Sequence, residues 1–125
     1  MVEVEVEVAH QPEGHVLVRL AGEIDISHRA AVQQAFRHAF AAAGAAVVVD
    51  LCEVRFLAVS GADCVDAAVC ALRDRGRTVR VVCADRGPVW RSVCLLGLDR
   101  QWPVHHDVTR AVASLPLDDA GEPDR

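Results

Sequence analysis

Residues 46–62 read Ala-Val-Val-Val-Asp-Leu-Cys-Glu-Val-Arg-Phe-Leu-Ala-Val-Ser-Gly-Ala, and this stretch decides the fold class. Residues 46–51 form an apolar run broken only by Asp50, which is typical of a central strand covered on both faces. After a short loop, Ser60 is expected to open an amphipathic helix with apolar residues every three to four positions. A buried strand followed by such a helix predicts a parallel sheet with helices packed on it.

The N-terminal side of this stretch continues the pattern. Valine alternates with glutamate over residues 2–8, and apolar residues alternate again over residues 16–20. We therefore expect two neighbouring strands, the second of which ends at Gly22. A helix capped by Ser27 and closed by Gly44 is expected to lead into the central strand.

The C-terminal side repeats the alternation of strand and helix. It predicts a strand over residues 79–83, a helix that begins at Pro88, a short extended piece over residues 102–105 and a final helix capped by Asp107. Taken together, the elements predict a single α/β domain with a mixed, mostly parallel sheet of about five strands and four helices.

The size and composition of the chain agree with one domain. It has 125 residues, of which 52% are apolar and 25% are charged, so it can bury a core and is not disordered as a whole. We assign residues 1–116 to the domain. Residues 117–125 are polar and acidic, and we expect them to form a disordered tail.

The charged residues exclude several function classes. Thirteen basic and eighteen acidic residues give a net charge of −5, which argues against direct binding to nucleic acid or to an anionic membrane. All thirteen basic residues are arginines, so chemistry that needs a lysine is excluded. The chain shows neither a signal peptide nor an apolar run long enough to span a bilayer, and we expect a cytoplasmic protein.

No motif indicates a cofactor, a metal or an enzyme. The five cysteines include no C-x-x-C pair, so we expect reduced core residues and no zinc site. His105 and His106 are adjacent, and on a strand they would point to opposite faces. No Gly-x-Gly-x-x-Gly fingerprint occurs, and the expected loop before Ser60 argues against a hydrolase nucleophile elbow.

Three segments carry a resemblance to a known family. Residues 20–25, Leu-Ala-Gly-Glu-Ile-Asp, are similar to its G-E-[LI]-D turn after a strand. Residues 47–57 are similar to its central strand and the entry to its signature loop, and Ser60-Gly61 is similar to the end of its D-[ST]-[ST]-G signature. In this order, they make the chain from about residue 16 to about residue 115 resemble the STAS domain family, specifically the bacterial anti-sigma factor antagonists.

The resemblance implies a regulated binding module that catalyses nothing and needs no cofactor. In that family, a partner serine-protein kinase that is also the anti-sigma factor phosphorylates the residue before the glycine, and the unmodified domain binds that kinase. By position, Ser60 is the implied phosphorylation site. Whether the chain forms a homodimer stays open. The implied partner surface consists of Asp25, Arg55, Ala58, Val59, Gly61, Asp63 and Asp66.

The residues themselves leave other interpretations open. Ser60 followed by Asp63 is also a capping-box pattern, in which the serine is only a helix cap. Ala58 and Val59 replace the acidic residue and the first hydroxyl of the family signature. This favours, as an alternative, a non-phosphorylated scaffold or binding subunit of a regulatory or transport complex. A small-ligand or nucleotide sensor at the end of the central strand is a further alternative.

The acidic and basic candidates have simpler interpretations as well. Asp25 suits a turn or a helix cap, because short acidic side chains bond to nearby backbone amides. Asp63 and Asp66 are three residues apart and share one helix face, which is typical of a solvated surface. For Arg55, simple exposure in a loop is the alternative to contact with a partner carboxylate.

Overall fold

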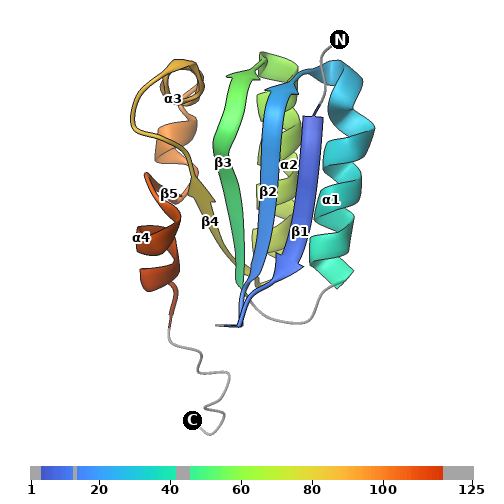
Figure 1. Cartoon of the computed structure of the whole chain (residues 1–125), viewed down its shortest axis with the longest axis vertical. Helices are drawn as coiled ribbons and strands as arrows, with labels where there is room; N and C mark the ends of the chain where they lie inside the picture. Colours follow the sequence, from blue (N-terminus) through green and yellow to red (C-terminus); the bar gives the residue numbers. More distant parts are fainter. Residues whose placement is uncertain (1–3, 13, 42–45, 117–125) are drawn as a thin grey trace, which may run out of the picture.

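The computed structural model describes residues 4–12, 14–41 and 46–116 (Figure 1). Within them it confirms a single α/β domain with one five-stranded sheet and four α-helices. The strands are β1 (Val4–His10), β2 (Val16–Ile24), β3 (Ala46–Leu57), β4 (Thr78–Val82) and β5 (Val104–His105). The helices are α1 (Arg29–Ala41), α2 (Val59–Asp74), α3 (Pro88–Leu95) and α4 (Val108–Ala113), with the short 3-10 helices η1 (Ile26–His28) and η2 (Leu98–Arg100).

The strands lie in the sheet in their chain order, β1-β2-β3-β4-β5. β1 pairs antiparallel with β2, which confirms the expected neighbouring pair, and every other pairing is parallel. Parallel strands cannot be joined by a tight turn, and here α1, α2 and α3 make the crossover connections. Because β2 and β3 run in the same direction, α1 and α2 both begin at the carboxyl edge of the sheet (Figure 1).

The two faces of the sheet are covered unequally. On one face, α1, α2 and α3 bury the main core, in which Val18, Leu20 and Val49 have no exposed surface. On the other face, α4 covers a small cluster of Leu17, Val48, Val82 and Ala111. In the described part of the chain, no helix covers the rest of this second face over β1, β2 and the end of β3 (Figure 1).

We call this uncovered region the open face. Cross-strand pairing assigns residues to it row by row, since directly opposed residues share a face. Glu7 lies opposite Arg19, which lies opposite Asp50; Glu5 lies opposite Ala21, which lies opposite Glu53; and Glu23 lies opposite Phe56. The open face therefore consists of Glu5, Glu7, Arg19, Ala21, Glu23, Asp50, Glu53 and Phe56.

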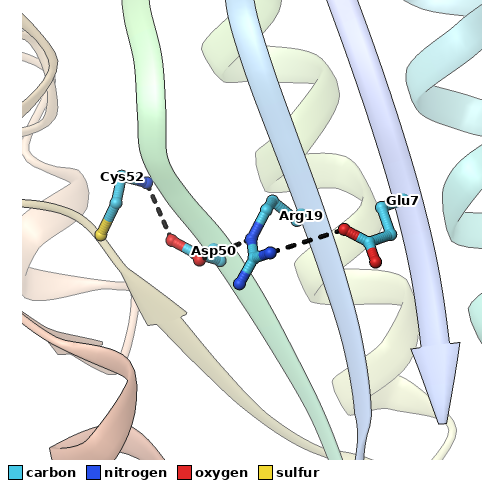
Figure 2. Close-up of polar contacts among 4 residues, drawn as sticks. All are labelled: Glu7, Arg19, Asp50 and Cys52. Atoms are coloured by element: carbon cyan, nitrogen blue, oxygen red, sulfur yellow. Dashed lines mark hydrogen bonds and ion pairs between the residues drawn. The ribbon is translucent and has the colours of Figure 1, made fainter.

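A row of polar contacts crosses the open face at the level of Arg19 (Figure 2). Arg19 Nε donates to Asp50 Oδ2 at 3.2 Å, and its Nη1 lies 3.5 Å from Glu7 Oε1. Asp50 Oδ1 accepts from the Cys52 amide at 2.9 Å. The partial burial of the Cys52 sulfur, together with the hydrogen bond and charge of Asp50, raises the pKa of this thiol to about 12. A charge inside the apolar run is thus satisfied by neighbours on both sides.

Two strands continue further than the sequence indicates. Gly22 does not end β2; it has a φ of 101° and lies at a register shift, so the strand bends there and continues to Ile24. β3 likewise continues to Leu57, which pairs with Ile24, in place of the expected loop. The two extensions stabilise each other through their backbone ladder. As a result, only Ala58 separates β3 from α2.

Other details differ from expectation or lie outside the described residues. Cys64 and Cys83 are buried, whereas Cys52, Cys70 and Cys94 are exposed, so three of the five cysteines are not core residues. All five are free thiols. The expected helix end at Gly44 and the tail over residues 117–125 lie outside the described residues. Of the helices that the structure describes, none combines the length and apolar character needed to cross a membrane.

Candidate functional site

Ser60 lies at the second position of α2, at the carboxyl end of the central strand β3. The N-cap residue is Ala58, with extended backbone angles and no side-chain capping bond. The first bond of the helix runs from the Ala62 amide to the Ala58 carbonyl at 2.8 Å. The capping-box prediction for Ser60 and Asp63 was therefore wrong. Because the strand runs directly into the helix, the helix starts two residues earlier than the capping pattern requires.

The Ser60 side chain is partly exposed. Its hydroxyl makes no hydrogen bond with any residue that the structure describes. The amides of Val59, Ser60 and Gly61 lie in the first helical turn, where the backbone offers no intrahelical acceptor. Ser60 thus combines an accessible nucleophilic oxygen with a helix end that favours negative charge.

Close packing between β2 and α2 fixes the position of Ser60. The Ala58 amide donates to the Ile24 carbonyl at 2.9 Å. Gly61 is buried against the same residue, and a Cβ added at Gly61 would lie 2.4 Å from the Ile24 oxygen. Gly61, one of the residues expected on the partner surface, therefore allows α2 to pack closely against β2. Any larger residue at this position would clash with the Ile24 carbonyl.

Asp25 follows Ile24 directly and organises the turn into α1. Its Oδ1 accepts from both the amide and the hydroxyl of Ser27, the amide at 2.9 Å. His28 Nδ1 lies 3.2 Å from the same oxygen. The hydrogen bonds from Ser27 lower the pKa of the Asp25 carboxyl, and the nearby His28 lowers it to a smaller extent. Ser27 was expected to cap α1, but it lies within η1, and α1 begins at Arg29.

The residues around the end of β3 present an exposed surface beside Ser60. Val59 is 60% exposed and Phe56 is 49% exposed, so two large apolar side chains lie on this surface. Arg55 is exposed, and its Nη2 lies 4.0 Å from Glu23 Oε2, a distance at which an exposed pair contributes little. Ala58 is partly exposed. Phe56 was expected only as part of the motif at residues 47–57 and was not assigned to the partner surface; the signal for its exposure was an aromatic residue next to Arg55.

Asp63 and Asp66 do not share one environment. Asp66 Oδ1 accepts from the Trp102 indole Nε1 at 2.8 Å, so this carboxylate links α2 to the segment after η2 and is not simply solvated. Asp63 is exposed and borders a groove of about 360 Å³ between α1 and α2. The groove is lined by Arg29, Gln33, Phe36, Arg37, Asp63, Cys64, Ala67 and Ala68.

Arg29, which sequence analysis did not select, lies at the end of this groove nearest the start of both helices. It is the first residue of α1. Burial raises the pKa of the Cys64 thiol and the positive charge of Arg29 lowers it, which places the guanidinium near Cys64. Ser60 lies one turn before Cys64 on α2, about 6 Å along the axis. Arg29 forms no ion pair or hydrogen bond within the described residues.

The histidine pair gives no metal centre. His106 Nδ1 lies 3.0 Å from the Cys83 carbonyl oxygen, and its ring packs edge-on against Trp90 with centroids 4.8 Å apart. Over residues 4–12, 14–41 and 46–116, no three His, Cys, Asp or Glu side chains are grouped as metal ligands.

Comparison with known protein families matches residues 8–109 to the family described as "Mlab, STAS domain". The chain belongs to the STAS domain family. This confirms the resemblance inferred from the motifs at residues 20–25, 47–57 and 60–61. Comparison with curated protein sequences finds no match.

Solved STAS structures show what the domain is similar to. An anti-sigma factor antagonist from Mycobacterium paratuberculosis is 27% identical, with a TM-score of 0.81 over 90% of this chain and 93% of that one. An antisigma-factor antagonist STAS domain from Rhodobacter sphaeroides is 22% identical, with a TM-score of 0.53 over 62% and 84%. The phosphorylated Bacillus cell fate determinant SpoIIAA is 17% identical, with a TM-score of 0.57 over 87% and 96%. The last two likenesses show the fold alone.

Proposed function

We propose that this STAS domain is an anti-sigma factor antagonist that binds a partner anti-sigma kinase when Ser60 is unmodified and is released when Ser60 is phosphorylated. The observation that carries the proposal is the partly exposed, unbonded hydroxyl of Ser60 at the second position of α2. The likeness to the mycobacterial antagonist supports the same function. The domain then acts by binding alone, in the cytoplasm, and catalyses no reaction.

The fold accommodates a phosphoryl group on Ser60 without unfolding. Such a group carries a charge of about −1.5 to −2 near neutral pH. The free amides at the start of α2 and the positive end of its dipole favour an anion there. Ser60 makes no internal hydrogen bond with the described residues that modification would have to break.

Two charged side chains act in opposite directions on that phosphoryl group. Asp63 lies three residues after Ser60, so its carboxylate repels a second negative charge. Arg29 supplies a guanidinium without an ion-pair partner among the described residues, and guanidinium pairs strongly with phosphate. We infer that Arg29 offsets the repulsion from Asp63 and holds the phosphoryl group beside α2.

Phosphorylation adds charge next to two apolar residues of the partner surface. Val59 is 60% exposed and Ala58 is partly exposed, and both adjoin Ser60. A partner that covers these residues must also desolvate the phosphoryl group, which costs free energy because the charge loses its water. Inverting a 1:99 population takes about 5.5 kcal/mol of differential binding. Loss of solvation and repulsion by partner carboxylates act in that direction.

Binding measurements with variants at one position test the proposal. We expect Ser60→Ala to keep the affinity for the partner anti-sigma kinase and Ser60→Asp and Ser60→Glu to weaken it at least tenfold, measured by calorimetry. Thr109→Glu is the matched control, because it adds the same charge on the exposed surface of α4. Equal affinity for Ser60→Ala and Ser60→Glu, or equal weakening by Ser60→Glu and Thr109→Glu, would contradict the proposal.

A second candidate is a non-phosphorylated STAS binding subunit of a regulatory or transport complex. Ala58 and Val59 favour it, because the family signature has an acidic residue and a hydroxyl at these positions. The same site then binds its partner constitutively through Val59. Under this alternative, Val59→Asp abolishes partner binding, whereas incubation with kinase and ATP changes nothing.

A further inference from the structure

We propose that the open face of β1, β2 and β3 is a docking surface for a basic protein segment, one that presents at least two arginine or lysine side chains. This surface is separate from the Ser60 site and does not depend on its phosphorylation. Figure 1 shows these strands with α1 and α2 on the far side of the sheet. Three observations carry the inference: the charge of the face, the arrangement of its unpaired carboxylates, and the exposure of Phe56.

The charge of the open face is predominantly negative. Its accessible carboxylates come from Glu5, Glu7, Glu23 and Glu53, because Asp50 is only 3% exposed, and its own rows contain one cation, Arg19. Arg19 is already shared between Glu7 and Asp50 (Figure 2). Arg55, beside the face, lies 4.0 Å from Glu23. Glu5 and Glu53 form no ion pair within the described residues, so their charges are available to a partner.

The two unpaired carboxylates lie in one row. Glu5 on β1 and Glu53 on β3 are both opposite Ala21 on β2. Adjacent strands are about 4.8 Å apart, so the Cα atoms of Glu5 and Glu53 are separated by about 9.6 Å. The side chain of Ala21 is small, so it does not fill the space between the two carboxylates. A guanidinium or ammonium group placed over Ala21 can therefore approach both carboxylates.

Phe56 gives this acidic surface an apolar anchor. It is 49% exposed and lies opposite Glu23, in the row next to Ala21 and Glu53. An aromatic ring beside carboxylates suits an arginine side chain, whose guanidinium can stack on the ring while its nitrogens bind the acids. The apolar stem of arginine or lysine can also cover part of the ring.

The negative charge of the open face argues against other kinds of binding partner. A second copy of this chain would bring Glu5 and Glu53 against equivalent carboxylates, and like charges repel in a closed interface. Nucleic acid and anionic lipid are repelled for the same reason. A purely apolar partner finds one large exposed side chain, Phe56, within a charged surface. A basic segment is the partner that can interact favourably with Glu5, Glu53 and Phe56 together.

A nine-residue oligoarginine peptide is the probe for the test. We expect calorimetry at moderate ionic strength to show binding that weakens with added salt, and no binding of a glycine-serine peptide of equal length. The double variant Glu5→Gln/Glu53→Gln should lose at least fivefold in affinity. Asp74→Asn/Asp99→Asn, which removes two exposed carboxylates from α2 and η2, should lose less than twofold.

Backbone amide shifts in an NMR titration locate the peptide directly. We expect the largest shifts in β1, β2 and the second part of β3, and we expect Phe56→Ser to weaken binding in addition. Ser60→Asp should leave the peptide affinity unchanged, so failure of this inference is distinguishable from failure of the proposed function. Equal losses from the two double variants, or shifts spread over the helices, would overturn the inference.

Discussion

The two halves of β3 behave as two different strands. From Val47 to Leu51 every residue is buried, because the main core covers one face, while α4 covers Val48 and Arg19 covers Asp50 on the other. From Cys52 to Leu57 only Val54 and Leu57 are buried, and the other four residues are exposed. The backbone continues the same ladder with β2 through both halves.

The difference separates a half that stabilises the sheet from a half to which we assign the proposed binding surfaces. The first half anchors the sheet, since its side chains find apolar neighbours on both sides. The second half keeps one apolar face for α2 and presents the other to solvent, where Phe56 and Glu53 lie. It also delivers Ala58 and Ser60 to the edge of the sheet. Four predictions test this division, from the largest expected effect to the smallest.

The largest contrast is between apolar residues in the two halves. Leu51 is 1% exposed, so Leu51→Ala should lower the free energy of unfolding by about 2–5 kcal/mol through lost burial and a residual cavity. Phe56 is 49% exposed, and Phe56→Ala should cost less than about 1 kcal/mol. Urea unfolding of both variants measures the difference. Similar losses would show that the second half is as tightly packed as the first.

The contact between β2 and α2 separates a structural residue, Gly61, from the proposed phosphorylation site, Ser60. Gly61→Ala places a Cβ against the Ile24 carbonyl and should destabilise the fold by about 1–3 kcal/mol through overpacking. Ser60→Ala is the adjacent control, and we expect a change within about 0.5 kcal/mol. Thermal and urea unfolding give both values. A neutral Gly61→Ala would mean that α2 is free to move away from β2.

Variants in and beside the Arg19 row test the boundary between the two halves of β3. Asp50→Asn removes the buried charge that pairs with Arg19 and should cost about 1–2 kcal/mol. The Cys52 thiol pKa of about 12 should also fall, because Asp50 contributes to raising it. We therefore expect faster alkylation of Cys52 at pH 8 in the variant. Arg55→Gln, which affects only an exposed pair at 4.0 Å, should change neither quantity.

The smallest effect concerns the turn beside Ser60 and its dependence on pH. The pKa of Asp25 is lower in the folded state, so its ionised form stabilises the fold above the carboxyl titration range, and this contribution is lost as the pH falls. Asp25→Asn should therefore lower Tm slightly at pH 7, and the difference from wild type should shrink toward pH 3. Paired thermal unfolding curves measure it. A difference that grows on acidification would contradict the assigned Ser27 bonds.

Most of the fold could be predicted from periodicity. The alternation at residues 2–8, the buried run at 46–51 and the Asp107 cap all rest on local rules, and Asp107 does accept from the Arg110 amide at 2.7 Å. The burial pattern in the second half of β3 could not be predicted. Its buried positions, Val54 and Leu57, are three residues apart, which is not a strand period. A register shift in the pairing with β2 produces that spacing, and pairing between distant segments is not visible in local sequence.

The candidate site was predicted in its location more than in its contacts. Family resemblance pointed to Ser60, and the structure places it at the start of α2. The role of Gly61 depends on Ile24, which lies 37 residues earlier in the chain, and the role of Asp66 depends on its hydrogen bond from Trp102. Arg29 was missed, and Phe56 was not assigned to the partner surface, for the same reason. Their significance comes from neighbours that only the folded chain supplies.

The most direct test of the central claim is the intact mass of the protein after incubation with ATP and the anti-sigma kinase proposed as its partner, followed by a binding measurement on the same sample. We predict one added phosphate in the wild type, none in Ser60→Ala, and loss of kinase binding by the phosphorylated fraction. An unmodified wild-type chain in the presence of a kinase that phosphorylates another substrate would contradict the account. So would a phosphorylated chain that binds the kinase as tightly as before.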